Sequence, residues 1–360
     1  MNFYNPRSID KKNATYNIIF GERSNGKTYA MLKKALEWYW KDGSQMAYVR
    51  RWKEDITGRR AQRLFSGINE NGEVEKITKG EFTGVHYYAG KFYLCNYDDK
   101  GKPIYSDADT LAFTFALSDS EHDKSTSFPN VNLIVFDEFL TNRLYLNDEF
   151  VLFMNVVSTI VRKRETVKIY MLGNTVNKYC PYFSEMGLNH ILKMQQGTID
   201  VYRYGESPLT VAVEYCKSLN SGKMQTNRYF AFNNPKLEMI TGGAWEMNIY
   251  PHLPHKYKPR NILLTYFIEF NDALFQCEVI DVNGDVFTYV HKKTTPIKKG
   301  TDLVYSLEPS SSPYYNRNIF KPVNKVQERI AWFFKHDKVF YQSNDIGDAV
   351  ANYLKICKRG

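Results

Sequence analysis

The sequence has no hydrophobic run long enough to cross a membrane, and it has few cysteines. No apolar stretch approaches about 18 residues, and the N-terminal MNFYNPRSIDKKN is too polar for a signal peptide. The five cysteines are odd in number and far apart, and no Cys-x-x-Cys pair or Cys/His cluster has zinc-site spacing. We therefore expect reduced thiols, mostly in the core, in a protein that is made and used inside a cell and is not secreted.

Apolar and basic residues are present in amounts typical of a folded, basic protein. Hydrophobic residues make up 43% of the chain and aromatic residues 15%, which excludes a disordered tail. Lys and Arg outnumber Asp and Glu by 48 to 39, giving a net charge of +9. This charge is compatible with a polyanionic partner and equally with a basic, soluble surface. The length of 360 residues predicts two domains.

The stretch GERSNGKT, residues 21–28, matches the P-loop pattern G-x-x-x-x-G-K-[S/T] at every fixed position. An apolar run at 16–20 precedes it, apolar residues at helical spacing follow it, and a second strand is predicted at 46–51. This strand, loop, helix order is the context that the motif requires, so an ordinary strand–helix turn is a poor alternative.

In a P-loop, each position has a role. Gly21 and Gly26 permit the tight backbone path, Lys27 reaches the β- and γ-phosphates, and the Thr28 hydroxyl binds Mg²⁺. The N–H groups of the loop and of the helix N-terminus cradle the phosphates of ATP. The remaining loop residues that we expect to bind nucleotide are Glu22, Arg23, Ser24 and Asn25.

Two acids end the apolar run LIVFDE and predict the second half of the site. Asp137 suits a Walker-B acid that holds Mg²⁺, and Glu138 suits the base that orients or deprotonates the attacking water. Adjacent carboxylates at a strand end repel each other unless a cation is near; the alternative is a solvated turn. Asn174 ends the next predicted strand, VKIYMLGNT, and is a candidate γ-phosphate sensor.

Basic residues offer candidates for an arginine finger, which stabilises charge on the transferred phosphoryl group. Arg162 and Arg164 lie where a helix predicted at 148–164 ends, and a cationic helix terminus explains them equally well. Arg23, inside the glycine loop, is a competing candidate for a contact within the same subunit.

Alternating strands and helices predict an α/β domain with a mainly parallel sheet over residues 1–210, a P-loop ATPase domain. Residues 52–110 read as an elaboration with short strands beside the core sheet. A linker with a small helical part is expected at 211–256. Three strands in a meander and two helices then predict a separate α+β domain at 257–360.

As an ordered set, these motifs resemble the DNA-encapsidation ATPases of small short-tailed bacteriophages that prime replication with a terminal protein. The match covers most of residues 1–180 and is specific as a set, whereas the C-terminal third matches only in pattern. The shared segments are FYNP (3–6), GERSNGKT, YVRRWK (48–53), KSTSFPNVNLIVFDEF (124–139), and VRKRETV followed by LGNTV.

The resemblance implies a ring-forming ATPase of the ASCE type, a pentamer, which docks transiently at the portal of an empty prohead in the host cytoplasm. It would push double-stranded DNA inside, using ATP and Mg²⁺. It implies that Arg162 acts in trans on a neighbouring subunit and that Asn174 is the sensor. The residues that it places near the adenine are Phe3, Tyr4 and Asn5.

The resemblance also implies basic loops that grip DNA. Lys53 and Lys124 are the expected contacts, with Arg50 and Arg51 less surely, and a solvated strand end or polar loop is the alternative for each. Phosphate contacts made by Lys and Arg carry no sequence information, as a packaging motor requires.

For the C-terminal domain, the resemblance implies a ribonuclease-H-like fold that has lost its metal ligands, a vestigial nuclease. Glu269, Asp345 and Asp348 are carboxylates in this domain, but they do not form a convincing full set for a two-metal nuclease. We read it as a docking and nucleic-acid-binding module. Some relatives dock through a structural RNA, and the sequence leaves open whether this one does.

Three other functions remain open at this point. A HerA–FtsK-like or helicase-type cellular translocase would use the same P-loop chemistry, but no helicase motif set or second ATPase domain is visible. A terminase with an active C-terminal nuclease would cut plasmid DNA in the presence of metal. A non-catalytic, nucleotide-gated ring component would bind ATP without turnover, and Glu138 argues against it.

Overall fold

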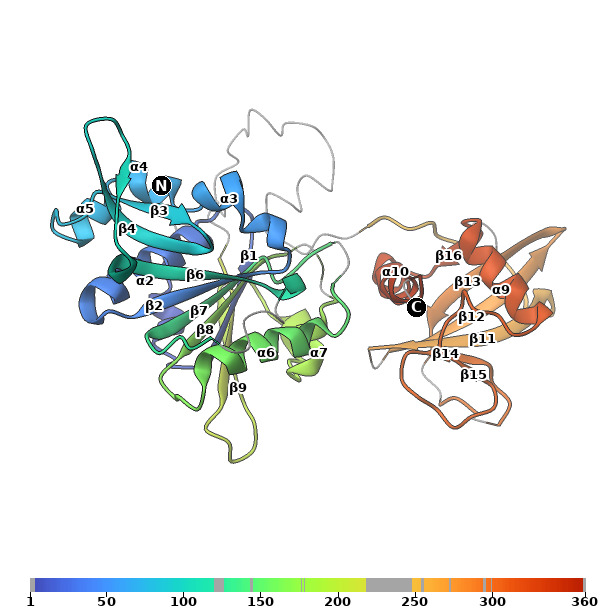
Figure 1. Ribbon diagram of the computed structural model, residues 1–360. Coiled ribbons are helices and arrows are strands. Elements are labelled where there is room, and N and C mark those ends of the chain that lie inside the picture. Colours follow the sequence, from blue (N-terminus) through green and yellow to red (C-terminus); the bar gives the residue numbers. More distant parts are fainter. Residues whose placement is uncertain are drawn as a thin grey trace. The chain divides into compact units, whose positions relative to one another are not determined.

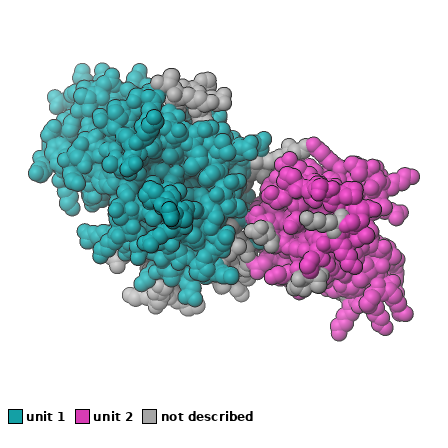
Figure 2. Space-filling model, turned by 90° about the horizontal axis from the view of Figure 1, so that it is seen from below, with its two compact units in different colours: residues 1–246 teal, residues 247–360 magenta. Residues whose placement is uncertain are grey.

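The computed structural model forms two compact units, residues 1–246 and 247–360 (Figures 1 and 2). The residues that the structure describes are 4–119, 126–142, 145–175, 177, 179–217, 248–253, 256–271, 273–293, 296–298 and 300–358. Within these ranges, no helix combines the length and apolar character needed to cross a membrane. All five cysteines are buried and free, as expected.

The first unit is built on a sheet of ten strands, in the order β3-β4-β6-β2-β7-β8-β1-β10-β9, with β5 paired to β4. The six strands from β6 to β10 in this order pair in parallel, and antiparallel strands extend both edges. The strands are β1 Tyr16–Gly21, β2 Gln45–Arg50, β3 Gly84–Tyr88, β4 Lys91–Tyr97, β5 Pro103–Ile104, β6 Thr110–Ala116, β7 Val131–Asp137, β8 Lys168–Asn174, β9 Thr198–Arg203 and β10 Thr210–Tyr215.

Strand β8 lies between the P-loop strand β1 and the acid-bearing strand β7. The largely parallel α/β sheet, with the glycine loop and the acid pair at strand ends, confirms the expected P-loop fold class. Because parallel strands end at the same edge, the order brings the ends of β1, β7 and β8 together.

Helices cover both faces of this sheet and close a core on each. Strand β7 shows why: Ile134 and Phe136 enter one core, whereas Leu133 and Val135 enter the other, as alternation requires. The helices are α1 Arg7–Asp10, α2 Lys27–Asp42, α3 Gly58–Gln62, α4 Ser66–Glu70, α5 Glu73–Ile77, α6 Glu149–Val161 and α7 Pro181–Glu185.

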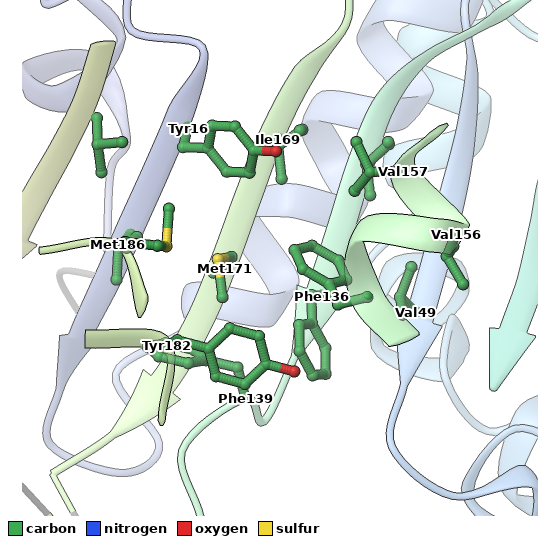
Figure 3. Packing of buried hydrophobic residues seen from close by; sticks show 14 of the residues in the cluster. Tyr16, Val49, Phe136, Phe139, Val156, Val157, Ile169, Met171, Tyr182 and Met186 are labelled. Atoms are coloured by element: carbon green, nitrogen blue, oxygen red, sulfur yellow. The ribbon is translucent and has the colours of Figure 1, made fainter. Parts of the chain in front are cut away.

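Helix α2 packs its apolar stripe on the face that carries Leu133 and Val135, and α6 packs on the face that carries Ile134 and Phe136. Figure 3 shows the α6 core, in which Phe136 of β7 and Phe139 lie beside Tyr182 of α7. The ring centroids of Phe139 and Tyr182 are 5.9 Å apart at 88°, an edge-on contact. The segment that follows Asp137 is therefore anchored in a packed aromatic cluster.

The second unit is a six-stranded sheet, in the order β15-β14-β11-β12-β13-β16, with two helices. Strands β11, β12 and β13 form the predicted antiparallel meander, and parallel strands β14 and β16 extend it on either side. This meander with parallel additions beside its first strand fits the ribonuclease-H-like expectation. The elements are β11 Ile262–Phe270, β12 Ala273–Val282, β13 Asp285–Lys292, β14 Val304–Ser306, β15 Tyr315–Asn316, α9 Lys325–Lys335, β16 Val339–Tyr341 and α10 Asn344–Cys357.

The domain limits differ from those expected. Strand β10 runs to Tyr215 inside the first sheet, so this sheet continues past residue 210. At the other end of the expected linker, the Tyr250 hydroxyl donates to Asp348 at 2.9 Å, which places residues 248–253 in the second unit. Most of the expected helical part of the linker, 218–247, lies outside the described residues.

Candidate active site

A cavity of about 270 Å³ lies where β1, β7 and β8 end. It joins three segments that are far apart in the sequence: the glycine loop, the acid pair and the end of β8. Its lining residues are Ser24, Asn25, Gly26, Lys27, Thr28, Tyr29, Asp137, Glu138, Leu172, Gly173 and Asn174. The strand order therefore brings the predicted phosphate, metal and sensor residues into one site.

The glycine loop has the backbone that a phosphate cradle needs. Gly26 has φ of 88° and precedes α2 directly, and Ser24 has φ of 59°, so the chain turns through left-handed conformations. A Cβ on Gly21 would lie 2.9 Å from the Cβ of Cys216 in the neighbouring strand region. Helix α2 carries no acid in its first turn, which leaves its positive dipole end free to attract an anion.

Lys27 is 6% exposed and its ammonium lies among oxygen atoms. Nζ donates to the carbonyl of Glu22 at 2.7 Å, to Oδ1 of Asn25 at 3.1 Å and to Oδ1 of Asn174 at 3.2 Å. Burial lowers the pKa of Lys27 below its ordinary value. Asn174 thus contacts the ammonium group of Lys27, and its role as a γ-phosphate sensor stays a prediction.

Asp137 accepts hydrogen bonds from two hydroxyl groups. Thr28 Oγ1 donates to Oδ2 at 2.9 Å, and the hydroxyl of Tyr48, on the neighbouring strand β2, donates to the same oxygen at 2.8 Å. A hydroxyl and a carboxylate in contact are the hard oxygen ligands that Mg²⁺ prefers, so these residues fit that ion. Sequence reasoning missed Tyr48, because nothing in MAYVRR shows which strand lies beside β2.

Glu138 follows in a left-handed conformation with φ of 58°, and its side chain is 58% exposed. Its Oε2 lies 2.6 Å from Nη2 of Arg50, which is also 3.5 Å from Asp55. Nη1 of Arg50 lies 3.9 Å from Oδ2 of Asp137. Arg50, expected at the DNA, is therefore placed against the acid pair.

The expected DNA contact of Arg51 is wrong, because this residue is buried and its guanidinium cannot reach a DNA backbone. Its side chain is 6% exposed and it forms an ion pair with Glu149 at 2.7 Å. Lys53 is 59% exposed and lies 2.6 Å from Asp119, so it remains a surface cation. Lys124 and Phe3 lie outside the described residues.

The N-terminal segment lies against the glycine loop. The N–H of Tyr4 donates to the carbonyl of Asn25 at 2.8 Å, and its hydroxyl donates to Glu214 at 2.6 Å. Burial raises the pKa of Glu214. Asn5 is exposed and its Oδ1 accepts from the N–H of Arg7 at 3.1 Å. The structure thus places Tyr4, but not Asn5, in contact with the P-loop.

The three arginine-finger candidates differ in their contacts and in their exposure. Arg162 ends α6 in a left-handed conformation and donates to the carbonyl of Thr126 at 2.7 Å; it also lines a second, open cavity. Arg164 donates to main-chain oxygens of Phe128 and Ile160, among others, so its guanidinium is committed within the subunit. Arg23 is exposed in the glycine loop.

The second unit offers no metal site within the residues that the structure describes, where no cluster of three His, Cys, Asp or Glu side chains is found. Glu269 is exposed on β11, and Asp348 accepts from Tyr250. A vestigial nuclease stays a prediction.

Comparison with known proteins gives one family. Its model, described as the Podovirus DNA encapsidation protein (Gp16), matches residues 1–203. The DNA packaging proteins of Bacillus phages PZA and phi29 are each 30% identical over 185 residues, 50% of this chain and 49% of theirs. This chain therefore spans about half the length of the curated relatives it matches.

A solved structure described as the bacteriophage Phi-29 viral genome packaging motor assembly contains a chain with the same fold. The TM-score is 0.59 at 21% identity, over 100% of this chain and 99% of that one. The expected resemblance is thus confirmed on motifs, geometry and family model. Because the family model matches more than half of the residues of this chain, the chain belongs to the Podovirus DNA encapsidation protein (Gp16) family.

Proposed function

We propose that this protein is an ATP-hydrolysing motor that moves double-stranded viral DNA into a preformed prohead. The observation that carries the proposal is the single cavity that joins Lys27, Thr28, Asp137, Glu138 and Asn174. The matching relatives are named DNA packaging proteins, which supports the proposal that ATP hydrolysis drives DNA packaging.

Nucleotide binding would use the glycine loop. The N–H groups around Gly26 and the N-terminus of α2 would hold the phosphates, and Lys27 would exchange its loop and Asn174 oxygens for phosphate oxygens. Thr28 and Asp137 would hold Mg²⁺, which when bound neutralises charge on the phosphates. Tyr4, whose N–H is bonded to the carbonyl of Asn25, would lie beside the adenine base.

Hydrolysis would use Glu138 as the residue that orients water and accepts its proton at Oε2. That oxygen is bonded to Arg50 at 2.6 Å in this structure, so the pair must open before the carboxylate can reach a water molecule. Asn174, bonded to Lys27, would position the γ-phosphate. The guanidinium of Arg162, at the end of α6, would contact the nucleotide of a neighbouring subunit.

The assembly would be a ring, a pentamer by resemblance, at the prohead portal in the host cytoplasm, with or without a structural RNA. Lys53 and Lys124 would contact DNA phosphates in its pore, whereas Arg50 would act at the acid pair. The second unit would serve docking and nucleic-acid binding.

The test is steady-state ATP hydrolysis with and without double-stranded DNA. We expect turnover that rises with DNA and falls at least about 100-fold in Glu138→Gln, because a general base contributes that much or more. ATP affinity should be retained in that variant, since Glu138 does not hold the phosphates. Binding without any turnover in the wild type would instead indicate a non-catalytic, nucleotide-gated ring component.

The role of Arg162 in trans can be tested by mixing inactive subunits. Arg162→Ala and Glu138→Gln subunits should each be inactive alone and recover part of the ATPase activity together under ring-forming conditions. Recovery is expected because a mixed interface unites one intact Glu138 with an intact Arg162 from its neighbour. No recovery, with ring formation verified, would argue against a finger in trans.

A further inference from the structure

A buried ion pair lies directly behind the loop that carries Glu138. Nε of Arg51 is 2.7 Å from Oε2 of Glu149, and Nη2 is 2.8 Å from Oε1, a bidentate contact. The two side chains are 6% and 0% exposed. Arg51 follows β2 and Glu149 begins α6, so the pair joins the central sheet to the helix on one face.

The remaining donors of Arg51 reach the main chain of the loop. Nη1 donates to the carbonyl of Glu138 at 3.2 Å, and Nη2 donates to the carbonyl of Phe139 at 2.7 Å. The guanidinium of Arg51 thus binds the carbonyl of Glu138, whose φ is 58°, and the carbonyl of the next residue. Such a conformation is disfavoured for a residue with a Cβ and persists only where its surroundings impose it.

The ion pair of Arg51 and Glu149 is itself held in place by neighbouring groups. The N–H of Leu146 donates to Glu149 Oε2 at 2.7 Å, and the Tyr182 hydroxyl donates to Oε1 at 2.9 Å. The guanidinium carbon of Arg51 lies 4.9 Å from the centre of the Tyr145 ring. Both carboxylate oxygens of Glu149 and the face of the Arg51 guanidinium therefore have further contacts that hold the pair in place.

We propose that Arg51, fixed by Glu149, is a positioning residue that sets the backbone of Glu138 and so aims its carboxylate. The proposal rests on the ATPase function above and deepens it. Stability alone is a weak reason for such a pair, because well-packed apolar side chains of similar size usually replace a buried ion pair without loss. The two contacts with the loop carbonyls give it a purpose that an apolar pair could not serve.

The central variant is Arg51→Met combined with Glu149→Gln. It leaves no unpaired buried charge. The glutamine oxygen can accept from the N–H of Leu146, and its NH₂ group can donate to the hydroxyl oxygen of Tyr182, which is also an acceptor. We expect ATP affinity within about threefold of the wild type, because no phosphate ligand is removed, and kcat lower by about 100-fold, the cost of displacing a catalytic group by roughly 1 Å.

Amide hydrogen exchange supplies a readout that does not need turnover. The N–H of Phe139 donates to the carbonyl of Leu172 at 3.1 Å. In the full-length double variant, we expect exchange in residues 138–142 at least about tenfold faster, while β1 and α2 keep their protection. Arg51→Lys should behave similarly, since one ammonium pairs with Glu149 but cannot span both carbonyls.

Val156→Ala is the matched control. It removes buried volume from α6 in the same core, at a position well apart from Phe139 in Figure 3, so it should lower stability but keep kcat and the protection of residues 138–142. Unchanged kcat and exchange in the double variant would overturn the positioning role; if that variant fails to fold, Arg51→Lys decides by the same readouts. A wild type without ATPase activity would remove the proposed function, and exchange would still decide the role of Arg51.

Discussion

At the scale of single residues, the two arginines that end the strand YVRR have opposite surroundings. Arg50 lies on the same face of β2 as Tyr48, and both contact the acid pair at the end of β7. Arg51 points to the other face and pairs with Glu149 of α6. Successive side chains of a strand alternate between faces, so this division follows from the backbone. Two neighbouring cations thus hold the carboxylate and the main chain of Glu138, respectively.

A second residue-scale pair predicts a pH dependence in the second unit. Glu278 is 6% exposed and accepts from Tyr257 at 2.7 Å and from Gln276 at 2.6 Å, with His291 at 3.5 Å. The hydrogen bond to Glu278 raises the pKa of His291, although burial and Lys293 oppose the shift. Burial opposes ionisation of Glu278, but the hydrogen bonds from its neighbours outweigh it and lower its pKa.

These two pKa shifts make the stability of the folded state depend on pH. The raised pKa of His291 stabilises the folded state fully below the ordinary histidine pKa of about 6.5, and this stabilisation is lost as pH rises through the raised value. The Glu278 contribution is present above about 4.5 and is lost at lower pH. His291→Gln should therefore lower thermal stability by roughly 0.5–1 kcal/mol near pH 5.5 and by less near pH 8.5. An equal loss at both pH values, measured by calorimetry on the full chain, would contradict the ion pair.

The residues that could be predicted from the sequence are those with a fixed motif. The glycine loop, the acid pair and Asn174 can each be recognised from a local sequence pattern, and in the structure all three line one cavity. Arg50, Tyr48 and Glu149 could not be found in this way. Their partners are roughly 90 to 100 positions away and depend on strand order, which no local pattern contains.

At the scale of elements, the long strands and helices were predictable and the short ones were not. The apolar runs that became β1, β7 and β8 and the periodic run that became α2 match their predictions within a few residues. Strands β9 and β10, TIDVYR and TVAVEY, were missed because polar residues interrupt them, although β10 pairs with β1. Short helices α3, α4 and α5 carry too few turns for a periodic signal.

The end of β8 packs closely against the loop after Glu138, and this packing can be tested. A Cβ on Gly173 would lie 2.7 Å from Cδ1 of Leu140 and 2.9 Å from Cε1 of Phe139, both buried. Gly173→Ala should cost about 1–3 kcal/mol of unfolding free energy through overpacking. It should also lower ATP turnover, because Asn174 and the loop shift relative to each other.

Gly67→Ala is the control for that substitution. Gly67 lies in α4, and a Cβ there would meet only the Tyr29 ring at 3.8 Å, an ordinary contact. This variant should be neutral or stabilise by up to about 1 kcal/mol, because alanine favours helix. If Gly173→Ala were as stable and as active as Gly67→Ala, the close packing of β8 on the loop would not matter for function.

At the scale of the whole molecule, the chain combines a unit that carries the P-loop site with a second unit whose meander fits the ribonuclease-H-like expectation. Two-metal cleavage needs several carboxylates around the metal ions. Within the described part of the second unit, Glu269 is exposed and Asp348 is engaged by Tyr250. We therefore expect the first unit to carry out the chemistry and the second unit to serve binding.

We accordingly expect no metal-dependent cleavage of plasmid DNA. The measurement is incubation of the full-length protein with supercoiled plasmid and Mg²⁺ or Mn²⁺, with Glu269→Gln as a parallel sample. Nicking that requires metal and disappears in Glu269→Gln would identify an active nuclease and would revive the terminase interpretation. Nicking that persists in the variant would point to a contaminating nuclease.

Helix α6 begins at Glu149, which pairs with the arginine that holds the loop of Glu138, and Arg162 caps its other end. Its 13 residues span about 20 Å, and one intact hydrogen-bonded helix over that distance is stiff. In a ring, a tilt of α6 at the Glu149 end would therefore also move Arg162 at the other end. Inserting one residue into α6 would turn Arg162 by about 100° about the helix axis, and it would disrupt the proposed contact with the nucleotide of the neighbouring subunit while leaving the residues that line this subunit's own cavity unchanged.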